Sequence, residues 1–305
     1  MSAGKGRLFG GSIKTSKTTL VFYIISYVLI TVIALACLLP FIMLVSGSFT
    51  SEQVIRFQGY GILPKDFTLE AYELVFKHPE KIILAYGVSL YITVVGTVAG
   101  LFLTTMTAYV ISRKSFKYRN AFSFFFYFTT LFNGGMVCTY IFYIRYLHLK
   151  DNLLALILPG IFNIFYLLIM RSFVAAIPQA LIESAKIDGA GEFKIFTRIV
   201  LPLLPAGLAT IGLFIALNYW NGWYNAMLFM TTASKYPLQY MLYNLLMQAQ
   251  VMAQIASQAG ITVENLPGNS LKLATAVIAT GPVILFYPYV QKYFIKGVTI
   301  GSVKG

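Results

Sequence analysis

The chain has 305 residues, of which 58% are hydrophobic and only 11% are charged, whereas soluble proteins carry about a quarter charged residues. This composition excludes an ordinary soluble globular protein and indicates a polytopic membrane protein. The formal net charge is +13, and the basic residues cluster at the ends of apolar segments, which favours an anionic membrane face over nucleic acid as the reason for this charge.

Six apolar segments are long enough to cross a bilayer, which needs about 20 mostly apolar residues. We expect each to form one transmembrane helix, and the chain to be all-α. The first segment is too long for a cleavable signal peptide and lacks a small-residue cleavage site, so we expect it to be retained. In chain order the segments are 20–46, 82–112, 121–143, 153–175, 203–230 and 271–294.

The distribution of Lys and Arg between the connecting segments predicts the orientation. With the N-terminus inside, the inner segments hold 15 of the 23 basic residues and the outer segments hold eight. Both termini are therefore expected in the cytoplasm. Residues 1–19 form the N-terminal segment and 295–305 the C-terminal tail of a transmembrane domain over 20–294.

Two outer segments are long and contain helical patterns. The stretch 69–76 can be capped by Asp66 or Thr68. The Gln- and Met-rich stretch 239–258 also has helical spacing. Such segments fit either an extracytoplasmic partner or a simple cap on the bundle, and the sequence leaves both open.

The charged loop 176–202, between the fourth and fifth segments, must lie outside the hydrocarbon, because burying each of its charges there costs several kcal/mol. Pro178 suits the first position of a helix over 179–188, and Gly189 suits its left-handed end. A second helix over 192–200 places Phe193, Phe196 and Val200 on one face. The residues alone fit either a docking element or an ordinary re-entry loop.

The spacing within this loop resembles the EAA loop of ABC importer permeases, whose pattern is E-A-A, three residues, G, nine residues, I-x-L-P. Here Glu183-Ser184-Ala185 is followed by Gly189, then by Ile199 and Leu201-Pro202 at the same spacing. The core motif departs from the pattern only at Ser184, a small residue in place of the middle alanine.

Further motifs narrow the resemblance to carbohydrate-uptake permeases of the MalG type. They are Leu158-Pro159-Gly160 and Met170–Phe173 in the fourth segment, Leu217–Asn221 in the fifth, and the tail 291–305. Phe132–Met136 indicates the LplC/YtcP-like branch, in which a proline is common where Cys138 stands. The resemblance runs from about residue 15 to the C-terminus.

This resemblance implies a type I ABC importer permease fold, with six transmembrane helices and a cytoplasmic coupling loop. It implies one permease subunit of an ATP-driven oligosaccharide importer in the bacterial cell membrane. The expected partners are a MalF-like second permease, two copies of a cytoplasmic ATPase and an extracytoplasmic solute-binding protein. The residues expected to couple to the ATPase are Glu183, Ser184, Ala185, Asp188, Gly189 and Phe193.

The resemblance also implies contacts at three other places, each with a plainer alternative. Saccharides bind to aromatic faces and to amide groups, which the candidate path residues supply, although an aromatic belt or packing against the second permease fits as well. Residues 248–269 are expected to touch the binding protein. The tail from Gly301 is expected to reach the ATPase, or to be a frayed end. The candidate path residues are Asn133, Asn218, Trp220, Asn221, Trp223 and Tyr224.

We expect no catalytic residue, metal site, cofactor or structural disulfide on this chain. It lacks the G-x-x-x-x-G-K-[ST] loop, so ATP and Mg belong on the partner ATPase. A gradient-driven transporter would want an acidic residue or histidine inside a span, and none of the ten acidic residues lies in one. An intramembrane protease is disfavoured because both histidines lie in loops. A permease for a peptide or polyol remains the serious alternative.

Overall fold

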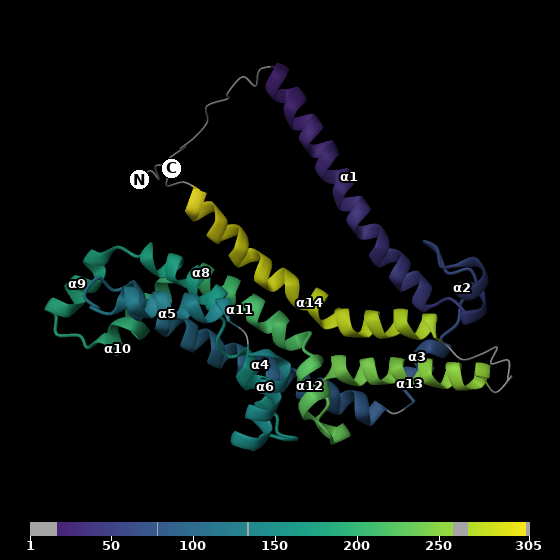
Figure 1. The fold of residues 1–305 in the computed structure, drawn as a ribbon. Coiled ribbons are helices and arrows are strands. Elements are labelled where there is room, and N and C mark those ends of the chain that lie inside the picture. Colours follow the sequence, from purple (N-terminus) through teal and green to yellow (C-terminus); the bar gives the residue numbers. More distant parts are fainter. Residues whose placement is uncertain (1–16, 78, 133, 259–267, 303–305) are drawn as a thin grey trace, which may run out of the picture.

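The computed structural model describes residues 17–77, 79–132, 134–258 and 268–302. Within these ranges the chain is helical, and its only β contact is an isolated bridge between Thr50 and Phe67. The all-α architecture is therefore confirmed. The helices form an elongated bundle, with α9 and α10 at one end and α2 and α3 at the other (Figure 1).

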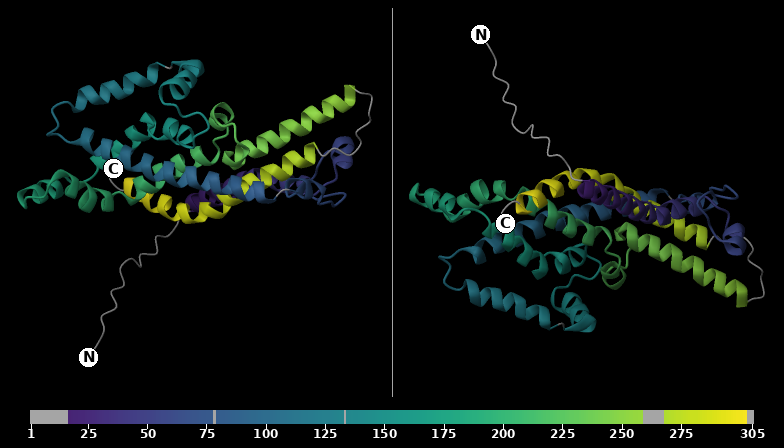
Figure 2. Two further views of the ribbon diagram at one scale, coloured as in Figure 1. Left: turned by 90° about the horizontal axis from the view of Figure 1, so that it is seen from below. Right: turned by 90° about the horizontal axis from the view of Figure 1, so that it is seen from above.

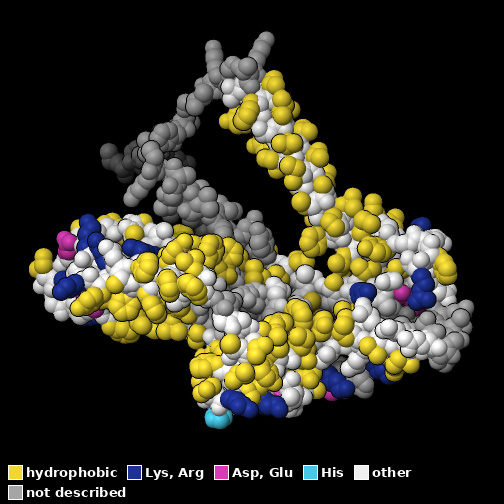
Figure 3. Space-filling view, viewed as in Figure 1, with side chains coloured by type: hydrophobic (Ala, Val, Ile, Leu, Met, Phe, Trp, Pro, Cys, Tyr) yellow, Lys and Arg dark blue, Asp and Glu magenta, His cyan; other side chains and the backbone are white. Residues whose placement is uncertain are grey.

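The N-terminal part consists of one long helix and two short ones. The long helix α1 (Lys17–Ser48) stands apart from the bundle over most of its length and is covered with hydrophobic side chains (Figure 3). Its main packing partner among the described helices is α14 (Asn269–Ser302). The short helices are α2 (Glu52–Gln58) and α3 (Glu70–Val75). The expected helix over 69–76 is confirmed, and the Thr68 hydroxyl accepts a hydrogen bond from the Glu70 amide at 3.3 Å.

All six expected apolar segments are helical, but the third, fourth and fifth are interrupted. The second is the unbroken α4 (Pro79–Ser112). The third comprises α5 (Arg119–Leu131), α6 (Gly135–Ile141) and the π-helical η1 (Phe142–Tyr146). The fourth comprises α7 (Leu154–Ile157), η2 (Leu158–Gly160) and α8 (Ile164–Ala175). The fifth comprises η4 (Leu201–Leu203), α11 (Pro205–Trp220) and α12 (Tyr224–Phe229).

The interruptions have local causes. Pro159 has no amide hydrogen to donate to a helix, and the Asn163 side chain starts α8 anew by accepting a hydrogen bond from the Phe165 amide at 2.9 Å. Gly135 adopts φ +78° at the start of α6, a conformation that favours glycine. By length and apolarity, α1 and α4 each suffice to cross a membrane, and up to five segments do so if each bent pair is one span.

The last helix is longer than the sequence indicates. It begins at Asn269, contains Pro282 and Pro288, and continues to Ser302. Residues 295–302, expected as part of a tail, are therefore helical, whereas 303–305 lie outside the described residues. Its start is capped by the buried Glu52, whose Oε2 accepts hydrogen bonds from the amides of Asn269 and Ser270, each at 2.8 Å. A carboxylate at this position is also favoured by the helix dipole.

Helix α4 is the axis of the bundle and packs against α8 and α11. Two glycines of α4 allow its neighbours to approach its backbone closely. A Cβ on Gly100 would lie 2.8 Å from the Ile161 carbonyl oxygen, and one on Gly96 would overlap the ring of Tyr219. The Tyr219 hydroxyl donates to the Ile157 carbonyl at 2.7 Å. Tyr219 therefore joins α11 to α4 and to the end of α7. In Figure 2, α5 and α6 (blue to teal) lie off the side of this bundle, and no residue of either is buried.

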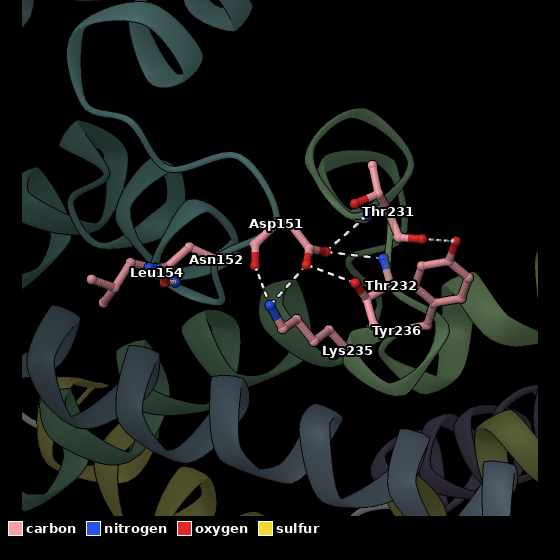
Figure 4. A network of polar contacts seen from close by, with 7 residues as sticks. All are labelled: Asp151, Asn152, Leu154, Thr231, Thr232, Lys235 and Tyr236. Carbon is pink, nitrogen blue, oxygen red and sulfur yellow. Dashed lines mark hydrogen bonds and ion pairs between the residues drawn. The ribbon is translucent and has the colours of Figure 1, made fainter.

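A polar clasp joins the loop before α7 to the loop before α13 (Leu238–Gln258), which contains η5 (Ala233–Lys235) (Figure 4). The Asp151 carboxylate accepts hydrogen bonds from the amides of Thr231 and Thr232, each at 3.0 Å, and from the Thr232 hydroxyl and the Lys235 ammonium, each at 2.8 Å. These bonds, that from Lys235 above all, hold the pKa of the Asp151 carboxyl well below its usual range.

Candidate functional site: an exposed helical hairpin and an amide-lined hollow

The charged loop folds as a helical hairpin, as its spacing predicts. Its parts are α9 (Gln179–Ile187), α10 (Glu192–Ile195) and the π-helical η3 (Phe196–Val200). Gly189 ends α9 with φ +75°. The Ala190 amide donates to the Ala185 carbonyl at 2.9 Å and the Gly189 amide to the Lys186 carbonyl at 3.0 Å. This pair of hydrogen bonds is the Schellman motif, which needs a left-handed residue at the position of Gly189.

The inner face of the hairpin is packed against the ends of α4, α8 and α11. Phe196 is fully buried, with its ring centroid 5.9 Å from that of Phe102 and 5.7 Å from that of Tyr109. Its burial contributes roughly 2 kcal/mol to holding the hairpin in place. Val200 is buried as well, whereas Phe193, whose ring centroid lies 6.5 Å from that of Phe196, is 64% exposed. Ile195 is also fully buried on this side.

The outer face of the hairpin combines acidic and apolar side chains. Glu183, Ser184 and Asp188 are exposed, and their side chains make no hydrogen bond or ion pair with any other residue in the described ranges. Ile187 is 87% exposed. Of the six predicted coupling residues, only Ala185 is buried, on the inner face of α9. Figure 3 shows this charged end of the molecule beyond the largely hydrophobic side of the bundle.

One charged cluster in this region is absent from the sequence prediction. Glu192, on the edge of the hairpin, accepts a hydrogen bond from the Tyr109 hydroxyl at 2.5 Å and pairs with the Lys186 ammonium at 2.5 Å. The Arg113 guanidinium lies 3.9 Å from the same carboxylate and 5.6 Å from the centroid of the Tyr109 ring. No sequence signal relates the two parts of this cluster, because Tyr109 and Glu192 are 83 residues apart in the chain.

Electrostatics favour the ionised form of this carboxylate. Partial burial raises the pKa of the Glu192 carboxyl, but hydrogen bonds from Lys186 and Tyr109, together with the nearby positive charges, outweigh it. The net result is a pKa below its ordinary value. Glu192 is therefore charged at neutral pH and bridges α9 to α4.

A second feature is a hollow of about 550 Å³ beside the break between α11 and α12. Of the predicted path residues, Asn218, Asn221, Trp223 and Tyr224 line it. Trp220 does not: only 7% of it is exposed, and its indole N–H donates to the Ala279 carbonyl at 3.1 Å. Asn133 lies outside the described residues. The structure adds to the lining Tyr166, Phe214, Leu217, Gly222 and Asn225.

The lining of the hollow combines neutral amides with aromatic rings. The Trp223 ring stacks on Tyr243 with centroids 4.5 Å apart, and the rings of Tyr166 and Phe214 stack at 6.0 Å. Stacking fixes the ring orientations. No side chain in the lining carries a charge. Such a surface can hydrogen-bond hydroxyl groups and pack against C–H faces, which suits a polyhydroxylated solute.

Known proteins resemble this chain over nearly its whole length. No protein-family model matches it. Protein LplC of Bacillus subtilis is 42% identical over 270 residues, which cover 88% of this chain and 90% of LplC. The polygalacturonan/rhamnogalacturonan transport system permease protein YtcP of the same organism is 38% identical over 284 residues, 93% of this chain and 98% of YtcP.

A solved structure agrees with these relatives. It is a bacterial ABC transporter involved in the import of the acidic polysaccharide alginate. One of its chains matches with a TM-score of 0.75 and 31% sequence identity, over 92% of this chain and 98% of that chain.

Proposed function

Because the chain belongs to the MalG-like family of carbohydrate ABC importer permeases, in its LplC/YtcP-like branch, we propose that it forms one half of the translocation pathway of an ATP-driven oligosaccharide importer. The other half is a second, MalF-like permease. The assembly lies in the bacterial cell membrane, with both termini of this chain in the cytoplasm.

The observation that carries the proposal is the outer face of the hairpin. Glu183, Ser184 and Asp188 are exposed without partners in the described ranges, beside the almost fully exposed Ile187. An apolar side chain of this size is stabilised when a partner covers it. We infer that the cytoplasmic ATPase does so, with Glu183 facing a basic residue or a helix N-terminus, while Phe193 lies at the edge of the contact.

ATP and Mg are held by the ATPase pair and not by this chain. When ATP binding closes that pair, the docked hairpins move with it, and the transmembrane helices switch between two arrangements. Such a switch requires that the nucleotide favour one arrangement by differential binding. This chain supplies no catalytic group to hydrolysis.

The hollow beside α11 is the proposed saccharide contact of this subunit. Its amides, Asn218 and Asn221, offer donors and acceptors to sugar hydroxyls, and Trp223 and Tyr224 offer aromatic faces. Trp220 is removed from the set because its indole is committed to Ala279. YtcP is named for a polygalacturonan and rhamnogalacturonan system and the solved relative for alginate, which supports a saccharide over a peptide or simple polyol.

An extracytoplasmic binding protein is proposed to deliver the saccharide to the opposite end of the bundle. Part of the predicted contact, 259–267, lies outside the described residues. Within the described part, the end of α13 exposes Val251, Met252 and Ile255. These three residues stand at positions i, i+1 and i+4 of the helix, so they share one side of it. They give the binding protein an apolar surface to cover.

Uptake by proteoliposomes tests the proposal. The complex is reconstituted with ATP inside, and uptake of labelled oligosaccharides is measured against ATP consumption. Asn221→Ala should raise the KM for uptake about fivefold, the effect of losing one uncharged hydrogen bond. Asn244→Ala, on α13 and outside the hollow, is the matched control. Uptake that persists without the ATPase, driven by an ion gradient, would contradict the proposal.

A further inference from the structure

We propose that Glu192 is a positioning residue that ties the ATPase-docking helix α9 to the inner end of α4, so that a movement of α9 reaches the saccharide hollow. The inference rests on the proposed function. It adds a role that neither the EAA spacing nor the relatives assign. Glu192 is not among the predicted docking residues. Its carboxylate contacts Tyr109 of α4 and Lys186 of α9 at the same time.

The hairpin needs such a tie because the segment that connects α9 to α10 is flexible. Only Asp188–Gly191 separate α9 from α10, and two of these four residues are glycines. At Gly189 and at Gly191 no other atom lies within 4 Å of the place that a Cβ would occupy. Within α9 only Ile182 and Ala185 are buried. A helix held by two small contacts and a glycine joint can pivot when a partner pulls it.

Glu192 removes this freedom by holding three groups together. Its Oε1 pairs with Lys186 of α9 at 2.5 Å, and its Oε2 accepts from Tyr109 of α4 at 2.5 Å. Arg113, one residue beyond the end of α4, adds its charge at 3.9 Å. Bonds to a charged group are about twice as strong as neutral ones. The carboxylate thus makes α9 and the end of α4 move together.

Helix α4 can carry that movement to the hollow. It is unbroken over 34 residues, about 50 Å at 1.5 Å per residue. Along its length Gly96 lies directly against the ring of Tyr219. Asn218, the neighbour of Tyr219 in α11, lines the hollow. A shift of α4 must therefore displace Tyr219, and with it the adjoining part of the lining.

A second route competes with this one, and the two predict different results. The buried Phe196 also touches α4, and the chain runs directly from η3 through η4 into α11. If this apolar contact and the covalent path carry the coupling alone, Glu192 is only a surface charge. The distinguishing group is Tyr109, because its hydroxyl meets Glu192 while its buried ring is left unchanged by Tyr109→Phe.

The experiment measures saccharide transported per ATP hydrolysed by the reconstituted complex. Wild type, Tyr109→Phe, Glu192→Gln and the double variant are compared, each checked for copurifying ATPase. Glu192→Gln should lower the ratio about fivefold, at the low end of measured coupling between sites, with the ATPase still bound. Tyr109→Phe should lower it as well, and the double variant should be no worse than Glu192→Gln, because both remove one tie.

Two results overturn the inference. One is an unchanged ratio in Glu192→Gln with the ATPase bound. The other is a double variant whose loss is the product of the two single losses. In either case the proposed function survives, because the ATPase still copurifies. A wild-type complex without any ATPase would instead refute the proposed function and the inference with it. Glu73→Gln is the control, because Glu73 is an exposed carboxylate on α3 at the opposite end of the bundle and its change should alter neither ATPase binding nor the ratio.

Discussion

Gly189→Ser should weaken the binding of the ATPase to the permease, whereas the same substitution at Gly191, two residues away, should not. Gly189 has φ +75°, and Gly191 has φ −67° and ψ 155°. Neither position has another atom within 4 Å of an added Cβ. Steric overlap is thereby removed from the comparison, and only the backbone conformation differs.

The expected magnitude follows from that difference. A side chain in the left-handed region costs about 1 kcal/mol, and the strain is relieved when the turn opens and α9 leaves its docked position. A penalty of about 1 kcal/mol lowers an equilibrium constant about fivefold. At Gly191 the extended backbone accepts serine, which is also a favoured residue at the N-cap of α10.

The assay is a titration of the purified permease pair with the purified ATPase, with the dissociation constant read by interferometry. Gly189→Asn serves as a rescue, because asparagine tolerates the left-handed region better than serine. Equal dissociation constants for Gly189→Ser and Gly191→Ser would refute the reasoning. So would Gly189→Asn binding more weakly than Gly189→Ser.

Three further changes test the packing and the outer end of the bundle by thermal unfolding in detergent. Gly96→Ala should cost about 2 kcal/mol through overlap with the Tyr219 ring, whereas Gly87→Ala in the open part of α4 should be neutral or slightly stabilising. Asp151→Asn should cost about 2 kcal/mol, because an amide cannot accept the hydrogen bonds that reach one carboxylate oxygen. Since the folded pKa is lowered, that cost should be constant above the unfolded value of about 3.9 and should shrink as the pH falls below it. Glu52→Gln should cost about 1 kcal/mol by weakening the cap of α14.

Each of these predictions has a result that would contradict it. Equal destabilisation by Gly96→Ala and Gly87→Ala would show that the glycine contact is not tight. A cost of Asp151→Asn that grows as the pH is lowered would have the wrong sign for a carboxylate stabilised in its ionised form. An unchanged melting temperature for Glu52→Gln would remove the cap from the account of α14.

The sequence predicted the hairpin closely because local signals specify it. A proline at its entry, a glycine at its turn and a fixed spacing place α9, and α10 together with η3, within about one residue of the expected bounds. The family resemblance, and with it the permease fold, is confirmed by the relatives and the solved structure. Apolar segments were found reliably, since length and hydrophobicity suffice to detect them.

Breaks within the segments and the directions of side chains were not predictable in the same way. A window of about 20 residues averages over Pro159 and over the Asn221–Trp223 break, so both segments read as continuous. Trp220 and Asn221 are both residue types that bind sugars. Only the hydrogen bond from Trp220 to the Ala279 carbonyl, which the sequence does not reveal, shows that Trp220 holds α11 to α14 instead of lining the hollow. Periodicity placed Phe193 on one face with Phe196 and Val200, but it could not show that Phe193 stays exposed, because burial depends on the helices that the hairpin packs against.

The coupling of this permease to an ATPase through the hairpin is the central claim, and copurification tests it most directly. The complex is extracted from its native membrane with wild-type chain or with Glu183→Lys, and the bound proteins are identified by mass spectrometry. Wild type should bring down a second permease and an ATPase, and the charge reversal should lose the ATPase while keeping the second permease. An ATPase retained equally by both would contradict the role of Glu183, and a wild-type chain that comes down alone would contradict the claim as a whole.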